Sequence, residues 1–216
     1  MNSEKIIIYQ VFTRLYGNRN TTRKEGGTMQ ENGCGKMNDF TPITLKKIRE
    51  MGVSHIWYTG IIRHATQTDY TAYGIPKNHP AIVKGQAGSP YAITDYYDVD
   101  PDLALDVDMR MQEFEQLIER THKAGMKVII DFVPNHVARQ YHSICKPEGV
   151  RIWVRRIIPN LALTLRIISI IVQVSTSRLI LISIMVRRSL ISRNLPRLRA
   201  MTVSIMRQAI MIGTRL

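Results

Sequence analysis

The chain has 216 residues and a formal net charge of +13, and its length suits one domain or part of a large one. A charge of this size is typical of proteins that bind nucleic acid or anionic membranes, but its distribution argues against both. All 17 acidic residues lie in residues 1–150, whereas residues 151–216 hold 12 arginines and no lysine, histidine or acid. Residues 1–150 therefore carry a net charge of only +1, and the basicity belongs to one segment rather than to a folded surface.

The two cysteines, Cys34 and Cys145, belong to no CxxC motif or Cys/His cluster. This spacing argues against a zinc site and against a disulfide framework. The apolar run near the N-terminus is too short for a signal peptide and is followed by no small-residue cleavage site. We therefore expect a reduced, cytoplasmic protein.

The first part of the chain alternates between predicted strands and helices. Ile6–Phe12 is a run of β-branched and aromatic residues, as expected for a strand that is buried on both faces. A polar loop occupies residues 16–40. A helix follows, in which Thr41 serves as the N-cap and Gly52 marks the end. Its predicted apolar face contains Leu45, Ile48 and Met51.

A second strand, a second long loop, a second helix and a third strand complete this part of the chain. The strands are predicted at Val53–Ile61 and Lys127–Val133. Residues 63–108 are rich in Gly, Pro, Tyr and Thr, which predicts a loop. Residues 109–124 predict a helix that Gly125 ends. Its apolar face is predicted to contain Met111, Phe114, Leu117 and Ile118.

The alternation of strands and helices predicts an α/β fold with a parallel sheet and right-handed crossovers. A doubly wound sheet and a (β/α)8 barrel both fit this pattern. The long loops follow the first and second strands and therefore lie at the carboxyl edge of the sheet, where parallel α/β folds form their active sites. Polar residues at this edge are the first candidates for function.

The segment DFVPNH places Asp131, Asn135 and His136 at the end of the third strand. We expect Asp131 to lie within the strand and the other two just beyond it. A carboxylate, an amide and an imidazole can together hold a polar ligand or an ion. The structural alternative is that Asp131 satisfies backbone donors, Asn135 forms a turn and His136 lies on the surface.

Four segments resemble the opening of the α-amylase superfamily, glycoside hydrolase family 13. They are IIIYQVFTRL, HIWYTG, SPYAITDYYDVDP and GMKVIIDFVPNH, and they occur in the order and spacing of that family. DFVPNH matches the first of the family's characteristic sequence regions. The resemblance covers essentially all of residues 1–150.

This resemblance implies a (β/α)8 catalytic barrel that cleaves α-glucosidic bonds of starch-type glucans or maltooligosaccharides with retention, using an aspartate nucleophile and a glutamate acid/base. It implies that His136 hydrogen-bonds the sugar, that Tyr91 stacks on the sugar ring and that Asp131 supports the strand end. Asn135 matches a position that binds calcium in many members. Calcium is therefore the only cofactor implied, and no organic cofactor is expected.

The segment DVDPDLALDVDM, residues 98–109, is similar to the start of an EF-hand calcium loop. An EF-hand requires Gly at the sixth position and Glu at the twelfth. Leu103 and Met109 stand at those positions. We therefore interpret the segment as a solvated loop that leads into the second helix.

Residues 151–216 contain neither Asp nor Glu. They can supply neither the nucleophile nor the acid/base that the resemblance implies, so no catalytic residue is assigned in this chain. The predicted organisation is about three βα units of an incomplete barrel in residues 1–150, followed by a non-native tail that forms no true domain.

A change of reading frame near the codon of Val150 accounts for the composition of this tail. Each residue largely fixes the first two letters of its codon, and these become the last two letters when the frame moves back by one nucleotide. Read in this way, RIWVRRIIP permits EDLGEKDNT, and Leu163–Val174 permits FDPKNNFYYCPG. The first product is acidic, the second is rich in aromatic residues, and both contain turn residues, as expected for loops of a soluble enzyme. We infer that one nucleotide is missing near this codon.

A membrane anchor over residues 161–186 and a basic nucleic-acid arm are the alternative interpretations of the tail. Arg166, Gln173 and Arg178 interrupt the apolar stretch, and a central arginine costs about 2.5–3.5 kcal/mol on membrane insertion. Arginines among β-branched residues form no clean amphipathic face. We expect an α-glucan as the partner, and neither nucleic acid nor a membrane. Two functions stay open: a glycoside hydrolase that is truncated and inactive as written, and a non-catalytic sugar-binding fragment.

Overall fold

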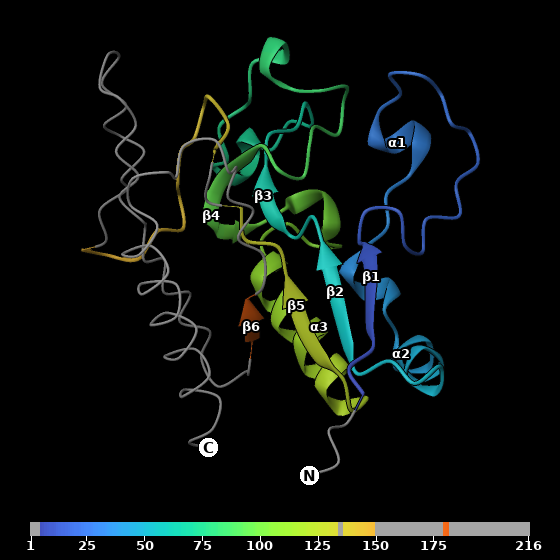
Figure 1. The fold of residues 1–216 in the computed structure, drawn as a ribbon. Coiled ribbons are helices and arrows are strands. Elements are labelled where there is room, and N and C mark those ends of the chain that lie inside the picture. The colour runs from blue at the N-terminus through green and yellow to red at the C-terminus, as the bar shows by residue number, and fades with distance from the viewer. Residues whose placement is uncertain (1–4, 134–135, 150–178, 182–216) are drawn as a thin grey trace, which may run out of the picture.

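The computed structural model describes residues 5–133, 136–149 and 179–181. Its main sheet has four parallel strands in the order β1-β2-β5-β6 (Figure 1). The strands are β1 (Ile8–Phe12), β2 (His55–Thr59), β5 (Lys127–Ile130) and β6 (Leu179–Leu181). In the register of the sheet, Tyr58 lies between Val11 of β1 and Ile130 of β5.

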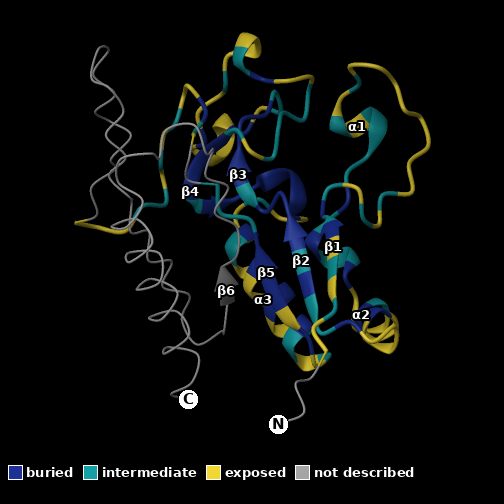
Figure 2. Ribbon diagram, viewed as in Figure 1, coloured by how far each residue is buried: buried dark blue, intermediate teal, exposed yellow. Residues whose placement is uncertain are grey.

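The three strands predicted from the sequence are confirmed as parallel neighbours, each shorter than predicted. β6 was not predicted, because the tail was expected to contribute no strand to the sheet. It pairs with β5, with Leu179 opposite Val128. β2 and β5 are buried along most of their length, whereas β1 is partly exposed (Figure 2). The α/β content of the described residues fits part of a barrel.

Helix α2, Pro42–Glu50, begins where the sequence predicts. The Thr41 hydroxyl accepts a hydrogen bond from the Thr44 backbone N–H at 3.2 Å, which satisfies one of the free donors of the first turn. Gly52 adopts a φ of +85°, a conformation that favours glycine after a helix end. Leu45 and Ile48 are buried as predicted, but Met51 is 60% exposed because it lies beyond the last helical residue. Its assignment to the apolar face is wrong.

Helix α3, Arg110–Lys123, packs on β5 and on α2. Phe114, Leu117 and Ile118 are buried, which confirms most of the predicted apolar face. The Tyr58 hydroxyl lies 2.7 Å from the Thr121 hydroxyl, so a buried hydrogen bond joins β2 to α3. Both aromatic and aliphatic side chains therefore fill the core between the sheet and its helices.

Residues 63–108 are not the single loop that the composition predicts. They contain most of an antiparallel pair, β3 (Ile62–His64) and β4 (Ile93–Val99). We refer to residues 62–100 as the excursion, and Figure 1 shows it above the carboxyl edge of the main sheet. Gly88 fits the excursion because a Cβ there would lie 1.7 Å from the Ala65 carbonyl oxygen.

Short helical elements occupy the remaining loops. They are α1 (Met29–Asn32), η1 (Met37–Asp39), η2 (Thr71–Tyr73), η3 (Pro80–Ile82) and η4 (Pro101–Leu103). A capping box starts α1, in which the Glu31 backbone N–H donates to the Thr28 hydroxyl and the Thr28 N–H donates to the Glu31 carboxylate. Local hydrogen bonds therefore order the part of the loop around α1, whereas Met37 and Phe40 at its end are buried in the main core.

Candidate active site

Asp131 lies at the carboxyl edge of the main sheet, one residue after β5. The expectation that it lies within the strand is wrong by one residue, since the ladder ends at Ile130. The Trp57 indole N–H, from the neighbouring strand β2, donates to Asp131 Oδ1 at 2.7 Å. Asp131 Oδ2 is buried and has no hydrogen-bond partner among the described residues. The Gly60 backbone N–H and the Thr59 hydroxyl also lie close enough to lower the pKa of this carboxyl group.

The environment of Asp131 favours its protonated form. Partial burial raises the pKa of this carboxyl group, and the hydrogen bond from Trp57 opposes the rise. A shift of this direction in a polar group at the carboxyl edge is typical of functional sites, although ion-pair networks produce similar shifts.

Tyr91 lies on the loop that leads into β4, and its side chain is 39% exposed. Burial and the nearby Asp131 carboxylate raise the pKa of its hydroxyl group. Gly60, at the end of β2, has a φ of +81°, and a Cβ there would lie 2.8 Å from the Phe12 ring and 3.3 Å from Pro90. The absence of a side chain at Gly60 lets this loop close over the strand ends. Tyr91 therefore lies within electrostatic range of Asp131.

His136 is exposed and directly follows residues 134–135, which lie outside the described chain. Its backbone carbonyl accepts a hydrogen bond from the Tyr96 hydroxyl at 3.2 Å, and the same hydroxyl donates to the Val133 carbonyl at 2.6 Å. Tyr96 of β4 therefore ties both ends of this segment to the excursion. Asn135 lies outside the described residues, so its predicted contact with calcium stays a prediction.

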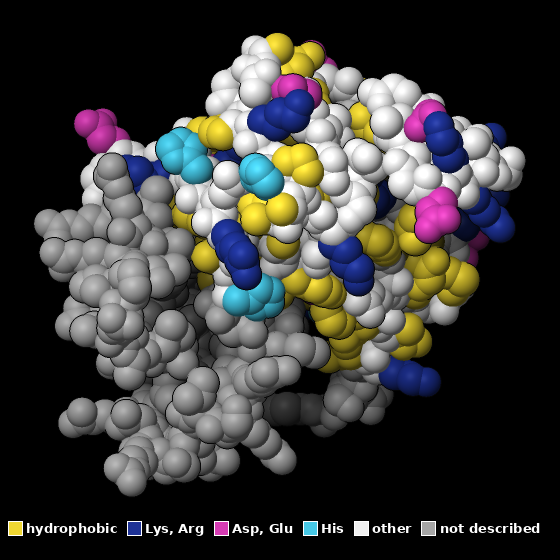
Figure 3. All heavy atoms as spheres, turned by 90° about the horizontal axis from the view of Figure 1, so that it is seen from above, with side chains coloured by type: hydrophobic (Ala, Val, Ile, Leu, Met, Phe, Trp, Pro, Cys, Tyr) yellow, Lys and Arg dark blue, Asp and Glu magenta, His cyan; other side chains and the backbone are white. Residues whose placement is uncertain are grey.

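Figure 3 looks onto the carboxyl edge from above. Histidine, lysine and arginine side chains lie among apolar side chains on this face, and acidic side chains are sparse.

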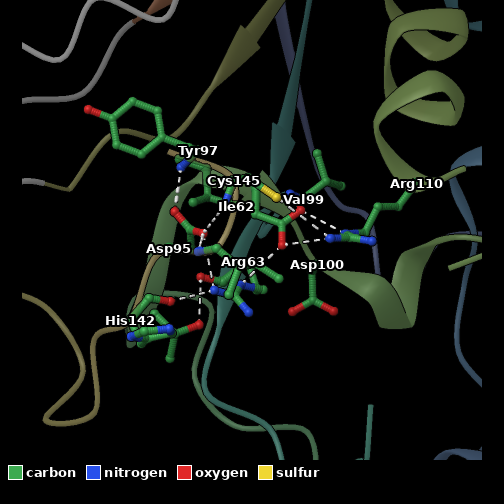
Figure 4. Close-up of polar contacts among 12 residues, drawn as sticks. Ile62, Arg63, Asp95, Tyr97, Val99, Asp100, Arg110, His142 and Cys145 are labelled. Atoms are coloured by element: carbon green, nitrogen blue, oxygen red, sulfur yellow. Dashed lines mark hydrogen bonds and ion pairs between the residues drawn. The ribbon is translucent and has the colours of Figure 1, made fainter. Parts of the chain in front are cut away.

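Sequence reasoning missed a network of buried ion pairs beside this edge (Figure 4). Asp98 accepts from the Arg110 guanidinium, at 2.7 Å to Nε, and lies 3.2 Å from Arg63 Nε. Arg63 Nη2 also contacts Asp95 at 3.1 Å. Asp95 Oδ2 in turn accepts from the backbone N–H groups of Ile144 and Cys145 at 2.9 and 3.3 Å. The network joins β3, β4, α3 and the segment after His142.

A second part of the network lies around η4. His64 Nδ1 lies 2.8 Å from Asp100 Oδ2, and both side chains are at least 97% buried. Asp102 pairs with Arg14 and accepts a hydrogen bond from the Tyr70 hydroxyl at 2.7 Å. Arg14 follows β1, so this part holds the excursion against the loop after the first strand.

The interpretation of residues 98–109 as a solvated loop is therefore wrong for its first half. Asp98, Asp100 and Asp102 are buried because four cationic side chains compensate the acidic groups of the network. The signal that could have revealed this was the β-branched and aromatic content of ITDYYDV, which is typical of a strand. Asp106 and Asp108 are exposed, as that interpretation predicts.

The described residues offer a poor fit to calcium at this network. Ligand atoms of Asp95, Asp98 and Cys145 lie within 4.8 Å of one another. Both carboxylates, however, are already paired with Arg63 or Arg110, and calcium prefers oxygen ligands over a thiol. A calcium role for this chain rests on Asn135 alone.

The His64–Asp100 pair predicts a pH dependence of stability. Burial lowers the pKa of His64, but the Asp100 carboxylate raises it above its usual value overall, and His64 holds the pKa of Asp100 below its usual value against the opposing effect of burial. The contribution of His64 to the stability of the folded state is fully present below about pH 6.5 and is lost as the pH rises through the pKa of His64 in the folded protein. The contribution of Asp100 to stability is lost in acid.

Thermal unfolding of the native chain and of His64→Gln between pH 5 and 9 tests this. We expect the difference in Tm to be largest near pH 5.5 and to shrink toward pH 9. A difference that is constant across this range would show that folding does not raise the pKa of His64.

Comparison with known proteins identifies the family to which the sequence is similar. Residues 10–147 match the family model described as alpha amylase, catalytic domain. Alpha-amylase MalA of Haloarcula japonica is 26% identical over 139 residues, which cover 64% of this chain and 15% of MalA. Trehalose-6-phosphate hydrolase of Bacillus subtilis is 25% identical over 138 residues, 64% of this chain and 18% of the relative.

A cyclomaltodextrin glucanotransferase of Geobacillus stearothermophilus is 22% identical over 147 residues. The chain spans 19% of that enzyme and thus only a small part of the curated relatives it matches. Among solved structures, the maltogenic alpha-amylase AmyB of Thermotoga neapolitana aligns over 65% of this chain and 26% of its own, with 28% identity and a TM-score of 0.42. The match of the family model over most of the chain shows that this protein belongs to the alpha-amylase catalytic-domain family.

Proposed function

We propose that the chain is the N-terminal part of a (β/α)8 glycoside hydrolase that acts with retention on α-glucosidic bonds of starch-type glucans or maltooligosaccharides. The observation that carries this proposal is the position of Asp131 at the carboxyl ends of the parallel strands, where the Trp57 indole N–H donates to it at 2.7 Å. Its carboxylate also contributes to the raised pKa of the Tyr91 hydroxyl group. Relatives named as amylase and glucanotransferase support an α-glucan substrate.

The described side chains suit the recognition of a sugar ring. An aromatic face such as that of Tyr91 matches the apolar C–H face of a glucosyl unit. The carboxyl group of Asp131, oriented by Trp57, offers hydrogen-bond acceptors at the same edge of the sheet. We propose that Asp131 supports the strand end and that the exposed imidazole of His136 donates a hydrogen bond to a sugar hydroxyl.

We propose that the chain as written binds sugar without cleaving it. Retaining hydrolysis requires a nucleophilic carboxylate and a carboxylic acid about 5–5.5 Å apart on either side of the glycosidic bond. The last acidic residue of the chain is Glu148. Residues 151–216, where the strands that bear both groups are expected, hold neither Asp nor Glu.

Of the described residues, none belongs to a helix long and apolar enough to cross a membrane. The segment 161–186, the alternative membrane anchor, lies almost entirely outside them. Cys34 and Cys145 are free thiols, which supports our proposal of a reducing, cytoplasmic location. Recovery of the protein with the membrane or secreted fraction of its host cell would contradict it.

Tyr91→Ala tests the sugar-binding proposal. We expect the affinity of the 216-residue chain for maltoheptaose to fall about fivefold to tenfold, because loss of an aromatic platform removes about 1–1.5 kcal/mol. Isothermal titration calorimetry measures the change.

Tyr73→Ala is the matched control. Tyr73 is 43% exposed and lies in η2 of the same excursion, 18 residues before Tyr91 in the sequence. We expect this variant to bind like the native chain. Equal losses in both variants, or no binding by the native chain, would count against the proposed site.

A further inference from the structure

A cavity lies between the excursion and residues 140–142, away from the candidate active site. Its volume is about 140 Å³, and neither Asp131 nor Tyr91 lines it. This volume holds about four or five water molecules and is well below the roughly 300–1,000 Å³ of pockets for larger organic ligands. The size selects a ligand as small as a tetrahedral oxyanion.

The lining is rich in hydrogen-bond donors. None of the described residues around the cavity is Asp or Glu, while Arg63, His64 and Lys77 contribute cationic groups. The carboxylates that pair with Arg63 and His64 stand behind these side chains rather than on the cavity wall. A ligand in the cavity therefore meets the donors before it meets the acids.

The hydrogen-bond partners of His64 engage one of its two ring nitrogens. Its side chain is 97% buried, and Nδ1 is engaged by Asp100 at 2.8 Å and by the Ile62 carbonyl at 3.3 Å. Since His64 lines the cavity and its Nδ1 is engaged, Nε2 is the ring nitrogen that remains for a ligand. The Asp100 carboxylate favours the imidazolium, in which Nε2 also carries a proton.

Two amide side chains are oriented in the same sense. Asn78 Oδ1 accepts from the Thr66 backbone N–H at 3.3 Å, and Gln140 Oε1 accepts from the His79 backbone N–H at 2.7 Å. With both carbonyl ends engaged, the amino ends remain as the groups that the cavity can use.

Lys77 lies at the rim of the cavity with its side chain 56% exposed, and it pairs with the exposed Asp69 at 3.0 Å. An ion pair this exposed contributes little and exchanges partners readily. Lys77 is therefore available to a negatively charged ligand that enters the cavity.

We propose that this cavity binds the phosphate or sulfate group of a small ligand, with Nε2 of His64 at its base, the amino groups of Asn78 and Gln140 on its wall and Lys77 at its rim. Charge-assisted hydrogen bonds are the strong ones in proteins, and a pocket that presents donors and excludes carboxylates discriminates for oxyanions. The proposal is independent of sugar binding at Tyr91.

Calorimetric titration of the full chain with inorganic phosphate, sodium sulfate, glucose 6-phosphate and glucose tests the proposal. We expect phosphate or sulfate to bind and glucose to give no signal at this site. Binding of glucose 6-phosphate alone would identify a phosphoryl group carried by a sugar, whereas binding of the free ions would identify an ion site. Absence of binding by all three anions, or equal binding of glucose, would overturn it.

Variants assign the binding to the cavity. We expect His64→Gln to weaken phosphate binding about tenfold and Lys77→Ala about threefold to fivefold. Lys84→Ala is the control, because Lys84 is an exposed lysine of the same excursion that does not line the cavity. Should His64→Gln fail to fold, the rim variant Lys77→Ala decides: an unchanged affinity, or a loss equal to that of Lys84→Ala, would refute the site.

Discussion

Insertion of one nucleotide after the codon of Val150 is expected to turn the chain, which we propose to be inactive, into an active glycosidase. In the restored frame the codons of residues 151–216 would encode acidic and aromatic residues in place of arginine and isoleucine. The protein would then continue into the strands that carry the nucleophile and the acid/base. Because glycosidases accelerate hydrolysis by at least about 10⁶-fold, the expected change is from no turnover of maltooligosaccharides to turnover that a reducing-sugar assay detects.

The control for this experiment is insertion of two nucleotides at the same codon, which places the downstream segment in the third frame. We expect that product to be inactive. The hypothesis fails if the codons of Arg151–Leu216 do not yield an acidic, aromatic reading one nucleotide back. It also fails if the purified 216-residue chain itself cleaves maltooligosaccharides.

Asp98→Asn is expected to cause a large loss of stability. The Asp98 side chain is fully buried between Arg63 and Arg110, whose side chains are 3% and 10% exposed. Removing one partner of a buried ion pair leaves uncompensated charge and costs about 3–5 kcal/mol. Since a domain of this size is stable by only about 5–15 kcal/mol, urea denaturation should show a much lower midpoint.

Asp69→Asn is the matched substitution at the surface, because Asp69 and Lys77 form an ion pair in which both side chains are at least half exposed. We expect this change to alter the free energy of unfolding by less than about 1 kcal/mol. A cost for Asp98→Asn that is no greater than the cost for Asp69→Asn would show that the buried network contributes little to stability.

The sequence predicts three of the four described strands of the main sheet because their residues are largely β-branched and aromatic. Val53–Ile61 and Lys127–Val133 owe their strand character to local composition alone, and the structure confirms β2 and β5 within them. The helix at Pro42 was equally readable, since an N-cap and a proline at the first turn are local signals.

The antiparallel strands and buried ion pairs of the excursion could not be predicted from local composition in the same way. In β4, Asp95 and Asp98 look like loop residues until their partners are known, and those partners lie 32 and 12 residues away at Arg63 and Arg110. Composition cannot distinguish a compensated buried aspartate from a solvated one. The roles of Tyr91 and Asp131 followed only from the family resemblance, and they remain predictions.

The ionic network also has a consequence for how the chain folds. Arg14 and Asp102 are 88 residues apart in sequence, and Asp95 receives its last donor from Cys145. Contacts of such long range form late, since the closure of long loops must come first. During synthesis the complete ion-pair network of the excursion therefore cannot form until Cys145 has left the ribosome. Every residue of the network that is named above precedes Val150, so the network forms without any contribution from residues 151–216.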